Sequence, residues 1–209
     1  MATIDSLFDS GRGRLGNLVL YKMKGRNIVR TKPEHYSDRK SPAQLAQRQR
    51  MQAVNNFLGP FGNLLSITFD PGSERLTARQ AAQSYNMRNA IAGEYPNIYI
   101  DKSQALLSRG PLPLPIKAWM ETDPEGLLIR WENGEEAQGI AAHDSLLVMA
   151  VFQGDSSCMY QFSEARRPAG QYLWKLQVPL NENALPDVWI SFRNDLKSLM
   201  SNSMYVLRG

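Results

Sequence analysis

Alternating apolar and polar positions near the start of the chain predict a β-hairpin. The runs Asn17–Met23 and Asn27–Lys32 flank Lys24-Gly25-Arg26, a three-residue connection in which glycine relieves the turn. Successive side chains of a strand point to opposite faces, so we expect one apolar face and one face that becomes cationic towards the turn. Val19, Tyr21 and Met23 share the first face, and Leu18, Leu20 and Lys22 share the second.

The apolar spacing then changes to a helical period, which predicts two amphipathic helices. Ser41 can cap the first helix and Pro42 suits its first turn, while Gly59-Pro60 ends the apolar repeat. The second helix is expected over Thr77–Ala92, whose first and fourth residues, Thr and Gln, have the spacing of a capping box. Gly93 is its expected stop.

Short β-rich runs between turn signals follow a proline-rich segment at residues 109–115, which we interpret as a stiff connector between domains. The runs are Ile116–Glu121, Leu127–Trp131, Ser145–Phe152, Cys158–Phe162, Gln171–Val178, Val188–Arg193 and Ser203–Leu207. Seven strands in so short a segment favour an antiparallel sandwich. Trp131, at the end of the second run, and the sequence around Val188–Arg193 look similar to a fibronectin type III module.

The predicted fold class is therefore α+β. An N-terminal β-hairpin and two amphipathic helices form a basic region over residues 1–110, and a seven-stranded antiparallel β-sandwich, similar to immunoglobulin and fibronectin III modules, follows over residues 111–209.

The formal net charge of +4 hides a gradient along the chain. Residues 1–50 hold eleven Lys or Arg against four Asp or Glu, and residues 111–209 hold eight against twelve, so the net charge falls from +7 to −4. Charge separated in this way produces a directional field if the two parts stay apart in space.

The cationic segment is the sequence feature with functional weight. The candidate partner-binding residues are Arg12, Arg14, Tyr21, Lys22, Lys24, Arg26, Arg30, Lys32, Arg39, Lys40 and Arg48. Such a mixture suits an acidic protein surface, and it also suits nucleic acid, where cations neutralise phosphates and tyrosine stacks on a base. A solvated hairpin face is the alternative without a function. We favour a protein partner, because no helix-turn-helix or aromatic RNA-binding strand is recognisable.

Catalytic options are few. Gly11–Gly16 reads GRGRLG, which matches a dinucleotide fingerprint, but a strand rather than a helix follows it, so we expect a flexible cationic loop. His143 and Asp144 could form a thiol triad with Cys158, yet adjacent residues entering a strand point to opposite faces. We expect Asp144 to order a turn and Cys158 to be a small core residue. Two histidines and one cysteine do not make a dedicated zinc site, and no cofactor is expected.

The compartment expected from the sequence is the cytoplasm. The first residues carry two acids and no apolar h-region, and the longest apolar run, Leu146–Phe152, is too short to cross a bilayer. Cys158 is the single cysteine, which fits a reducing compartment.

Several short motifs along the whole chain are similar to those of a Bacteroidetes family of about this size, a domain of unknown function. These are Leu15–Val19, Lys24-Gly25 with Val29-Arg30 and Lys32-Pro33, Ser41–Gln44 with Gln47-Arg48, Asn89–Ile91 with Tyr95-Pro96, Leu107-Ser108, Trp131, Asp144, and Ser201–Ser203 with Tyr205. The resemblance implies no particular activity, substrate or catalytic residue.

The leading hypothesis is a non-enzymatic structural or interaction protein that binds a partner through Leu18, Leu20, Tyr21 and the surrounding cations, for example by adding a strand to a sheet edge of the partner. The sequence is also compatible with an oligomer. Nucleic-acid binding through the same surface is the main alternative. An enzyme is a third possibility, because Arg166-Arg167 with Asp144 or Asp155 could bind an anion if the fold brought them together.

Overall fold

The computed structural model describes residues 2–3, 13–33, 38–135, 143–152, 158–176, 185–194 and 198–209. The chain forms two compact units, residues 1–41 and residues 42–209. The boundary that we placed at residue 110 therefore lies inside the second unit, in which helices and sheets pack on one another. The fold is mixed α+β, with three α-helices and mainly antiparallel strands in the described residues.

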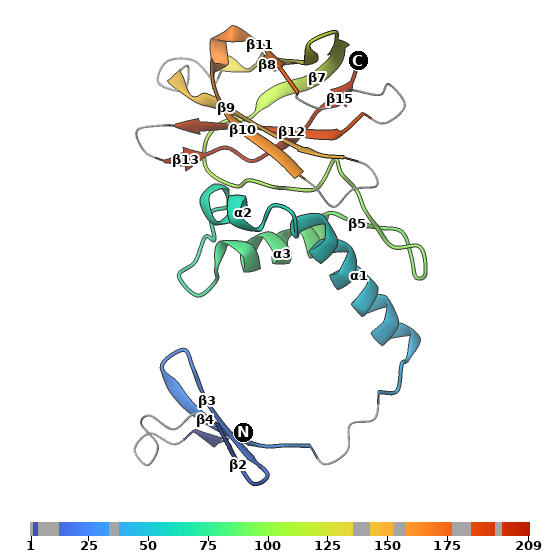
Figure 1. The fold of residues 1–209 in the computed structure, drawn as a ribbon, viewed down its shortest axis with the longest axis vertical. Coiled ribbons are helices and arrows are strands. Elements are labelled where there is room, and N and C mark those ends of the chain that lie inside the picture. Colours follow the sequence, from blue (N-terminus) through green and yellow to red (C-terminus); the bar gives the residue numbers. More distant parts are fainter. Residues whose placement is uncertain are drawn as a thin grey trace. The chain divides into compact units, whose positions relative to one another are not determined.

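The first unit is a small sheet built on the predicted hairpin (Figure 1). Strand β3, Leu18–Met23, pairs with β4, Arg26–Thr31, from Leu18↔Thr31 to Met23↔Arg26. The connection holds two residues rather than the predicted three. Lys24 (φ 50°) and Gly25 (φ 79°) both take positive φ, as a two-residue turn that matches the twist of a hairpin requires.

Two further strands extend this hairpin, in the order β1-β4-β3-β2. Strand β2, Gly13–Leu15, pairs with β3 across a turn in which Gly16 has φ 57°, and β1, Ala2–Thr3, pairs with β4. The prediction of a flexible loop at Gly11–Gly16 was therefore wrong for Gly13–Leu15, because this tight turn lets the segment add to β3. Gly11 and Arg12 lie outside the described residues.

The second unit begins with three helices. Helix α1, Pro42–Leu58, has the predicted bounds, and α2, Gly62–Thr68, is a short helix that we did not predict. Helix α3, Ala78–Asn89, begins at the predicted capping box, in which Thr77 accepts from the Gln80 N–H and the Gln80 side chain accepts from the Thr77 N–H.

Helix α3 ends three residues earlier than predicted. Ile91–Ala92 forms strand β5, which pairs with β6, Tyr99–Ile100. Gly93, with φ 75°, then turns the chain, and an added Cβ there would lie against the carbonyl oxygen of Asn97. Glycine was recognised as a stop signal, but it ends a strand rather than a helix.

The remaining strands form two sheets. They are β7 Pro115–Asp123, β8 Gly126–Asn133, β9 Ser145–Val151, β10 Cys158–Arg166, β11 Gln171–Trp174, β12 Asp187–Asn194, β13 Leu199–Met200, β14 Met204–Tyr205 and β15 Leu207–Arg208. One sheet has the order β10-β9-β12-β13, with β14 also on β12, and the other has the order β11-β8-β7-β15.

Each of the seven predicted runs contains a strand, but two features differ from the prediction. The described residues contain nine strands here, because β13 is additional and the last run divides into β14 and β15. The sheets are also not wholly antiparallel, since β15 pairs parallel with β7. The C-terminal segment changes sheets at Val206, which no alternation of apolar residues indicates.

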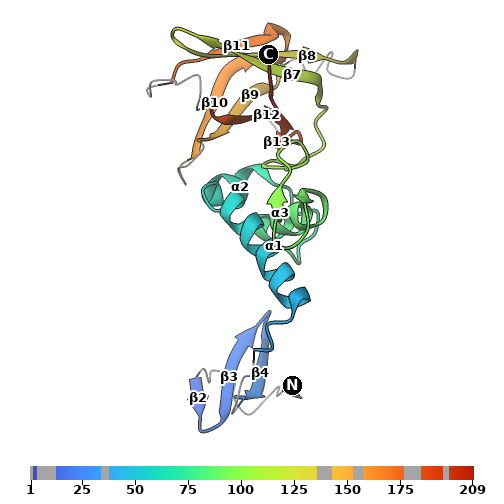
Figure 2. The ribbon, with the colours of Figure 1, turned by 90° about the vertical axis from the view of Figure 1, so that its right-hand side faces the viewer.

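The sheet containing β9 and β12 is covered on both faces (Figures 1 and 2). Leu147 and Met149 pack in one core with side chains of the three helices, whereas Leu146, Val148 and Ala150 pack in a second core with the other sheet. A strand covered on both faces needs a continuous apolar run rather than an alternating one, which explains the sequence of β9. The helices therefore belong to the same folded unit as the sheets.

Candidate functional site

The candidate binding residues divide between the two units. Nine of them are described in the first unit: Arg14 on β2, Tyr21 and Lys22 on β3, Lys24 in the turn, Arg26 and Arg30 on β4, and Lys32, Arg39 and Lys40 after it. Arg48 lies on α1, in the second unit, and Arg12 lies outside the described residues. We call residues 13–40 of the first unit, where they are described, the basic sheet.

The pairing register places three arginines on one face of the basic sheet. Residues directly opposite one another on antiparallel strands share a face. Arg14 and Arg30 both lie opposite Val19, and Arg26 lies opposite Met23. The prediction that this face is apolar was wrong, because it was based on the residues of β3 alone, and the neighbouring strands β2 and β4 add the arginines.

The basic sheet has an excess of exposed positive charge. Its described residues include eight Lys or Arg and one acid, Asp38. Among the described residues, none of these eight cations takes part in an ion pair. The Arg14 Nε donates to the Gly16 carbonyl oxygen (3.1 Å), and the Arg30 guanidinium lies 5.9 Å from the centre of the Tyr21 ring. In the described part of this unit, the positive charge is therefore exposed and not neutralised by an ion pair.

A buried ion pair forms where we expected only a turn. The Arg167 Nε donates to Asp144 Oδ2 at 3.1 Å, and both side chains are almost fully inaccessible. Asn194 donates to the other carboxylate oxygen, and the guanidinium lies 4.0 Å from the centre of the Phe192 ring. Burial lowers the pKa of Arg167, and the hydrogen bond and charge of Asp144 act in the opposite direction. This arrangement is typical of a structural pair.

The chemical constellations considered from sequence do not assemble as reactive sites. Arg167 is committed to Asp144, while Arg166 is exposed and donates to the His143 carbonyl oxygen, so they do not form an open anion site. His143 is exposed and Asp144 is buried. Cys158 is partly buried, its thiol donates to the Pro60 carbonyl oxygen, and burial raises its pKa, which disfavours the reactive thiolate. Asp155 lies outside the described residues.

A second polar cluster joins distant segments and was missed from the sequence. The Lys102 ammonium lies 2.5 Å from Asp187 Oδ2, and the Tyr205 hydroxyl donates to Asp187 Oδ1 at 2.9 Å. Burial, followed by the hydrogen bond to Asp187, raises the pKa of Tyr205 to about 12. The three residues lie on β12, β14 and the loop after β6, and no local pattern connects them.

Several residues of the family motifs form a buried hydrogen-bonded seam between residues 107–110 and 201–203. Ser203 Oγ accepts from the Leu107 N–H, Ser108 Oγ donates to the Ser201 carbonyl oxygen, and Asn202 Oδ1 accepts from the Gly110 N–H. A buried backbone needs such partners, since an unpaired group costs about 1–3 kcal/mol. Ser108 and Ser203 are therefore engaged in holding the two segments together.

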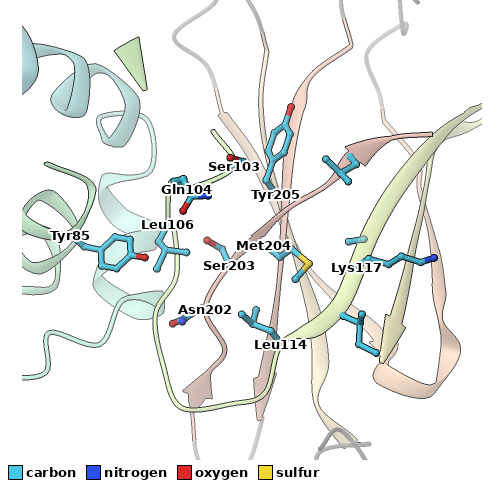
Figure 3. A pocket seen from close by; sticks show the side chains of 13 residues that line it. Tyr85, Ser103, Gln104, Leu106, Leu114, Lys117, Asn202, Ser203, Met204 and Tyr205 are labelled. Atoms are coloured by element: carbon cyan, nitrogen blue, oxygen red, sulfur yellow. The ribbon is translucent and has the colours of Figure 1, made fainter. Parts of the chain in front are cut away.

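Beside this seam lies a cavity of about 390 Å³. It lies between α3, the loop after β6, the first half of β7 and the segment that contains β14 and β15 (Figure 3). The apolar side chains around it include Leu106, Leu114, Ile116, Met204 and Leu207. Tyr85, Gln104 and Asn202 add neutral polar groups. We call it the β7 cavity.

Comparison with known proteins identifies the family. The model of a family of unknown function, DUF6266, matches residues 10–207. The chain belongs to this family. The Bacteroidetes origin that the sequence motifs indicated stays a prediction. No curated protein and no solved structure matches the chain.

Two further findings concern the described residues of this chain. None of the helices described is long and apolar enough to cross a membrane. The described residues also contain no group of three or more His, Cys, Asp or Glu side chains placed to hold a metal ion.

Proposed function

We propose that this DUF6266 protein is a non-enzymatic interaction protein and that its basic sheet binds an acidic surface of another protein. The excess of eight cations over one acid in the described part of the sheet is the observation that carries this proposal. The second unit would be the folded body to which this binding sheet is attached. A reducing compartment such as the cytoplasm suits its single cysteine.

Exposed apolar side chains favour a protein over a nucleic acid. In the same sheet Leu15 is 63% exposed, Met23 is 49% exposed and Leu18 is 38% exposed. Protein interfaces combine an apolar centre with a charged rim, whereas binding to a phosphate backbone needs mainly charge. Strand β2 is also the edge of the sheet and could pair with a strand of the partner.

Nucleic-acid binding is the second candidate function. The Arg30 guanidinium beside the Tyr21 ring resembles sites in which a cation neutralises a phosphate and an aromatic ring stacks on a base. Such binding would weaken steeply as salt rises, because neutralised phosphates release counterions.

We further propose that the two C-terminal sheets form a sandwich similar to a fibronectin III domain. It is supported by the shared core of the two sheets and by the buried Trp131, which lies 5.7 Å from Phe192 between ring centres. Domains of this kind often serve as scaffolds, and the parallel β15 would be an addition to that plan.

The test is charge reversal in the full chain. Replacing Lys22, Lys24, Arg26 and Arg30 by Glu should abolish capture of the partner protein from extracts of the native host while thermal unfolding of the second unit stays unchanged. The matched control replaces the exposed Arg75, Arg79, Arg88 and Arg109 of the second unit by Glu, which changes the net charge equally. Unchanged capture by the first variant, or equal loss in both, would contradict the proposal.

A mobility-shift titration with RNA and duplex DNA at two ionic strengths distinguishes the second candidate. Retention of the partner after nuclease treatment supports a protein. A shift that falls steeply with salt, and that the basic-sheet variant loses, would instead assign the surface to nucleic acid.

A further inference from the structure

We propose that the β7 cavity is a second binding site, independent of the basic sheet, and that it binds an extended, uncharged peptide segment as an added strand beside β7. The inference rests on three features of the cavity: a free strand edge, apolar side chains beside that edge, and polar groups that carry no free charge.

The free strand edge comes from incomplete pairing of β7. On one side, β8 pairs with β7 from Pro115 to Asp123, with a register shift between Pro115 and Lys117 that leaves Ile116 without a partner on β8. On the other side, β15 pairs only with Trp119 and Met120. Within the described residues, positions 115–118 therefore have no strand partner on that side. An open edge presents backbone donors and acceptors that an incoming strand can pair with.

Apolar side chains lie along this edge, where they would contact the side chains of an added strand. Leu114, Ile116 and Leu207 are exposed, and Leu106 and Met204 lie deeper in the same cavity. Exposed apolar side chains gathered at one cavity are typical of a binding surface. Because alternate residues of a strand face the same way, a peptide with apolar residues at every second position would cover them.

The polar groups around the cavity complement an uncharged occupant. In the described part of the chain, the Tyr85 hydroxyl and the Gln104 amide have no hydrogen-bond partner, and Asn202 uses only its oxygen, for the Gly110 N–H. The one charged side chain of the described lining, Lys117, and the Tyr205 hydroxyl are already engaged. Lys117 pairs with Glu132 at 3.2 Å and its ammonium points away from the other lining residues (Figure 3), and the Tyr205 hydroxyl donates to Asp187.

This charge pattern excludes several kinds of ligand. Among the described lining residues, a phosphate or carboxylate would find only Lys117, which is paired with Glu132, and a cationic ligand would find no carboxylate. Neutral hydroxyl and amide groups instead match the N–H and C=O groups of a peptide backbone. The cavity volume is also in the range that buries a few side chains rather than a whole partner domain.

The experiment begins with a phage-displayed library of random linear peptides selected on the full chain. Selection is repeated on Leu207→Lys, which places a charge at the cavity, and on Ile67→Lys as a matched control. Leu207 is 59% exposed and Ile67 is 61% exposed, and Ile67 lies on α2, away from the cavity lining. We expect enrichment of neutral peptides with alternating apolar residues on the wild type and on Ile67→Lys but not on Leu207→Lys.

An enriched peptide is then synthesised and titrated while backbone amide signals are followed by NMR. We expect the signals of residues 116–118 and 203–207 to shift, and the double variant Tyr85→Phe, Gln104→Ala to weaken binding about tenfold, as the loss of two hydrogen bonds predicts. A version of the peptide methylated at alternate backbone nitrogens should not bind, because it cannot pair with β7.

Three results would overturn the proposal. The first is that no peptide is enriched on the wild type relative to Leu207→Lys. The second is that the double variant binds the peptide as tightly as the wild type does. The third is that a neutral oligosaccharide such as maltotriose displaces the peptide. The last result would assign the cavity to carbohydrate, which neutral amides and tyrosines also recognise. Loss of partner capture through the basic sheet would not affect any of these readouts.

Discussion

Individual side chains in this protein show how distant residues determine the role of a local motif. Asp144 precedes β9 as expected for a turn residue, yet its carboxylate is buried against Arg167 and Asn194. The local sequence indicates an Asp before a strand, but not that the chain will return 23 residues later with an arginine. The structural role of Ser203 could not be predicted either, because its partner, the Leu107 N–H, lies 96 residues away in the sequence.

The buried ion pair gives the first prediction. Arg167→Met should lower the free energy of unfolding by about 3–5 kcal/mol, because it leaves the Asp144 carboxylate buried without its counter-ion. Urea unfolding of the purified chain measures this change. The exposed Arg75→Met should change stability by less than about 0.5 kcal/mol.

A second variant separates a lost charge partner from lost packing. Adding Asp144→Asn to Arg167→Met removes the uncompensated charge, so the double variant should be more stable than Arg167→Met alone. Equal stability of the two variants would contradict the electrostatic explanation.

Tyr205 gives a prediction for the dependence of stability on pH. Its pKa is about 12 in the folded chain and about 10 in an unfolded chain. Below pH 10 both states hold the proton, whereas between about pH 10 and 12 only the folded state holds it, so this contribution to stability is lost as pH rises through that window. We expect the urea midpoint to fall more steeply there for the wild type than for Tyr205→Phe. Parallel pH profiles would contradict this role for Tyr205.

At the scale of single elements, the sequence was most informative where a pattern is local. The bounds of α1, the capping box of α3 and the presence of strands in all seven predicted runs follow from capping residues, helical spacing and alternation. Helix α2 has seven residues, too few for its period to be recognised. The parallel pairing of β15 depends on where β7 lies in space, which two residues of sequence cannot specify.

The turn of the basic sheet allows a prediction at this scale. Both of its residues have positive φ, which costs about 1–2 kcal/mol for a residue with a Cβ. Gly25→Ala should therefore weaken the β3–β4 pairing, and Lys24→Asn should strengthen it, because Asn tolerates this conformation better than Lys. Amide hydrogen exchange of β3 and β4 measures both changes, and slower exchange in Gly25→Ala than in the wild type would contradict the assigned turn.

Across the whole molecule, the net positive charge lies in the first unit. Residues 1–41 carry nine Lys or Arg against four Asp or Glu, a net charge of +5, whereas residues 42–209 carry fifteen against sixteen, a net charge of −1. The cationic first part could therefore be predicted from the sequence.

The sequence did not indicate that the helices and the sheets pack in one unit. The proline-rich segment appeared to be a linker, although Pro115 begins β7 and is buried. Proline is compatible with the first position of a strand, so it did not mark a boundary there.

The shared core of helices and sheets leads to a prediction about fragments. Leu147 and Met149 on β9 and Trp189 on β12 pack with Leu58, Leu65 and Phe61 from the helical region. A fragment of residues 111–209 would expose one whole face of the central sheet, and an exposed apolar face of that size favours association. We therefore expect this fragment to bind a hydrophobic dye and to aggregate, whereas residues 42–209 should unfold cooperatively. Cooperative unfolding of residues 111–209 as a monomer would show instead that the sheets form an independent domain, which is the division that the proline-rich segment first suggested.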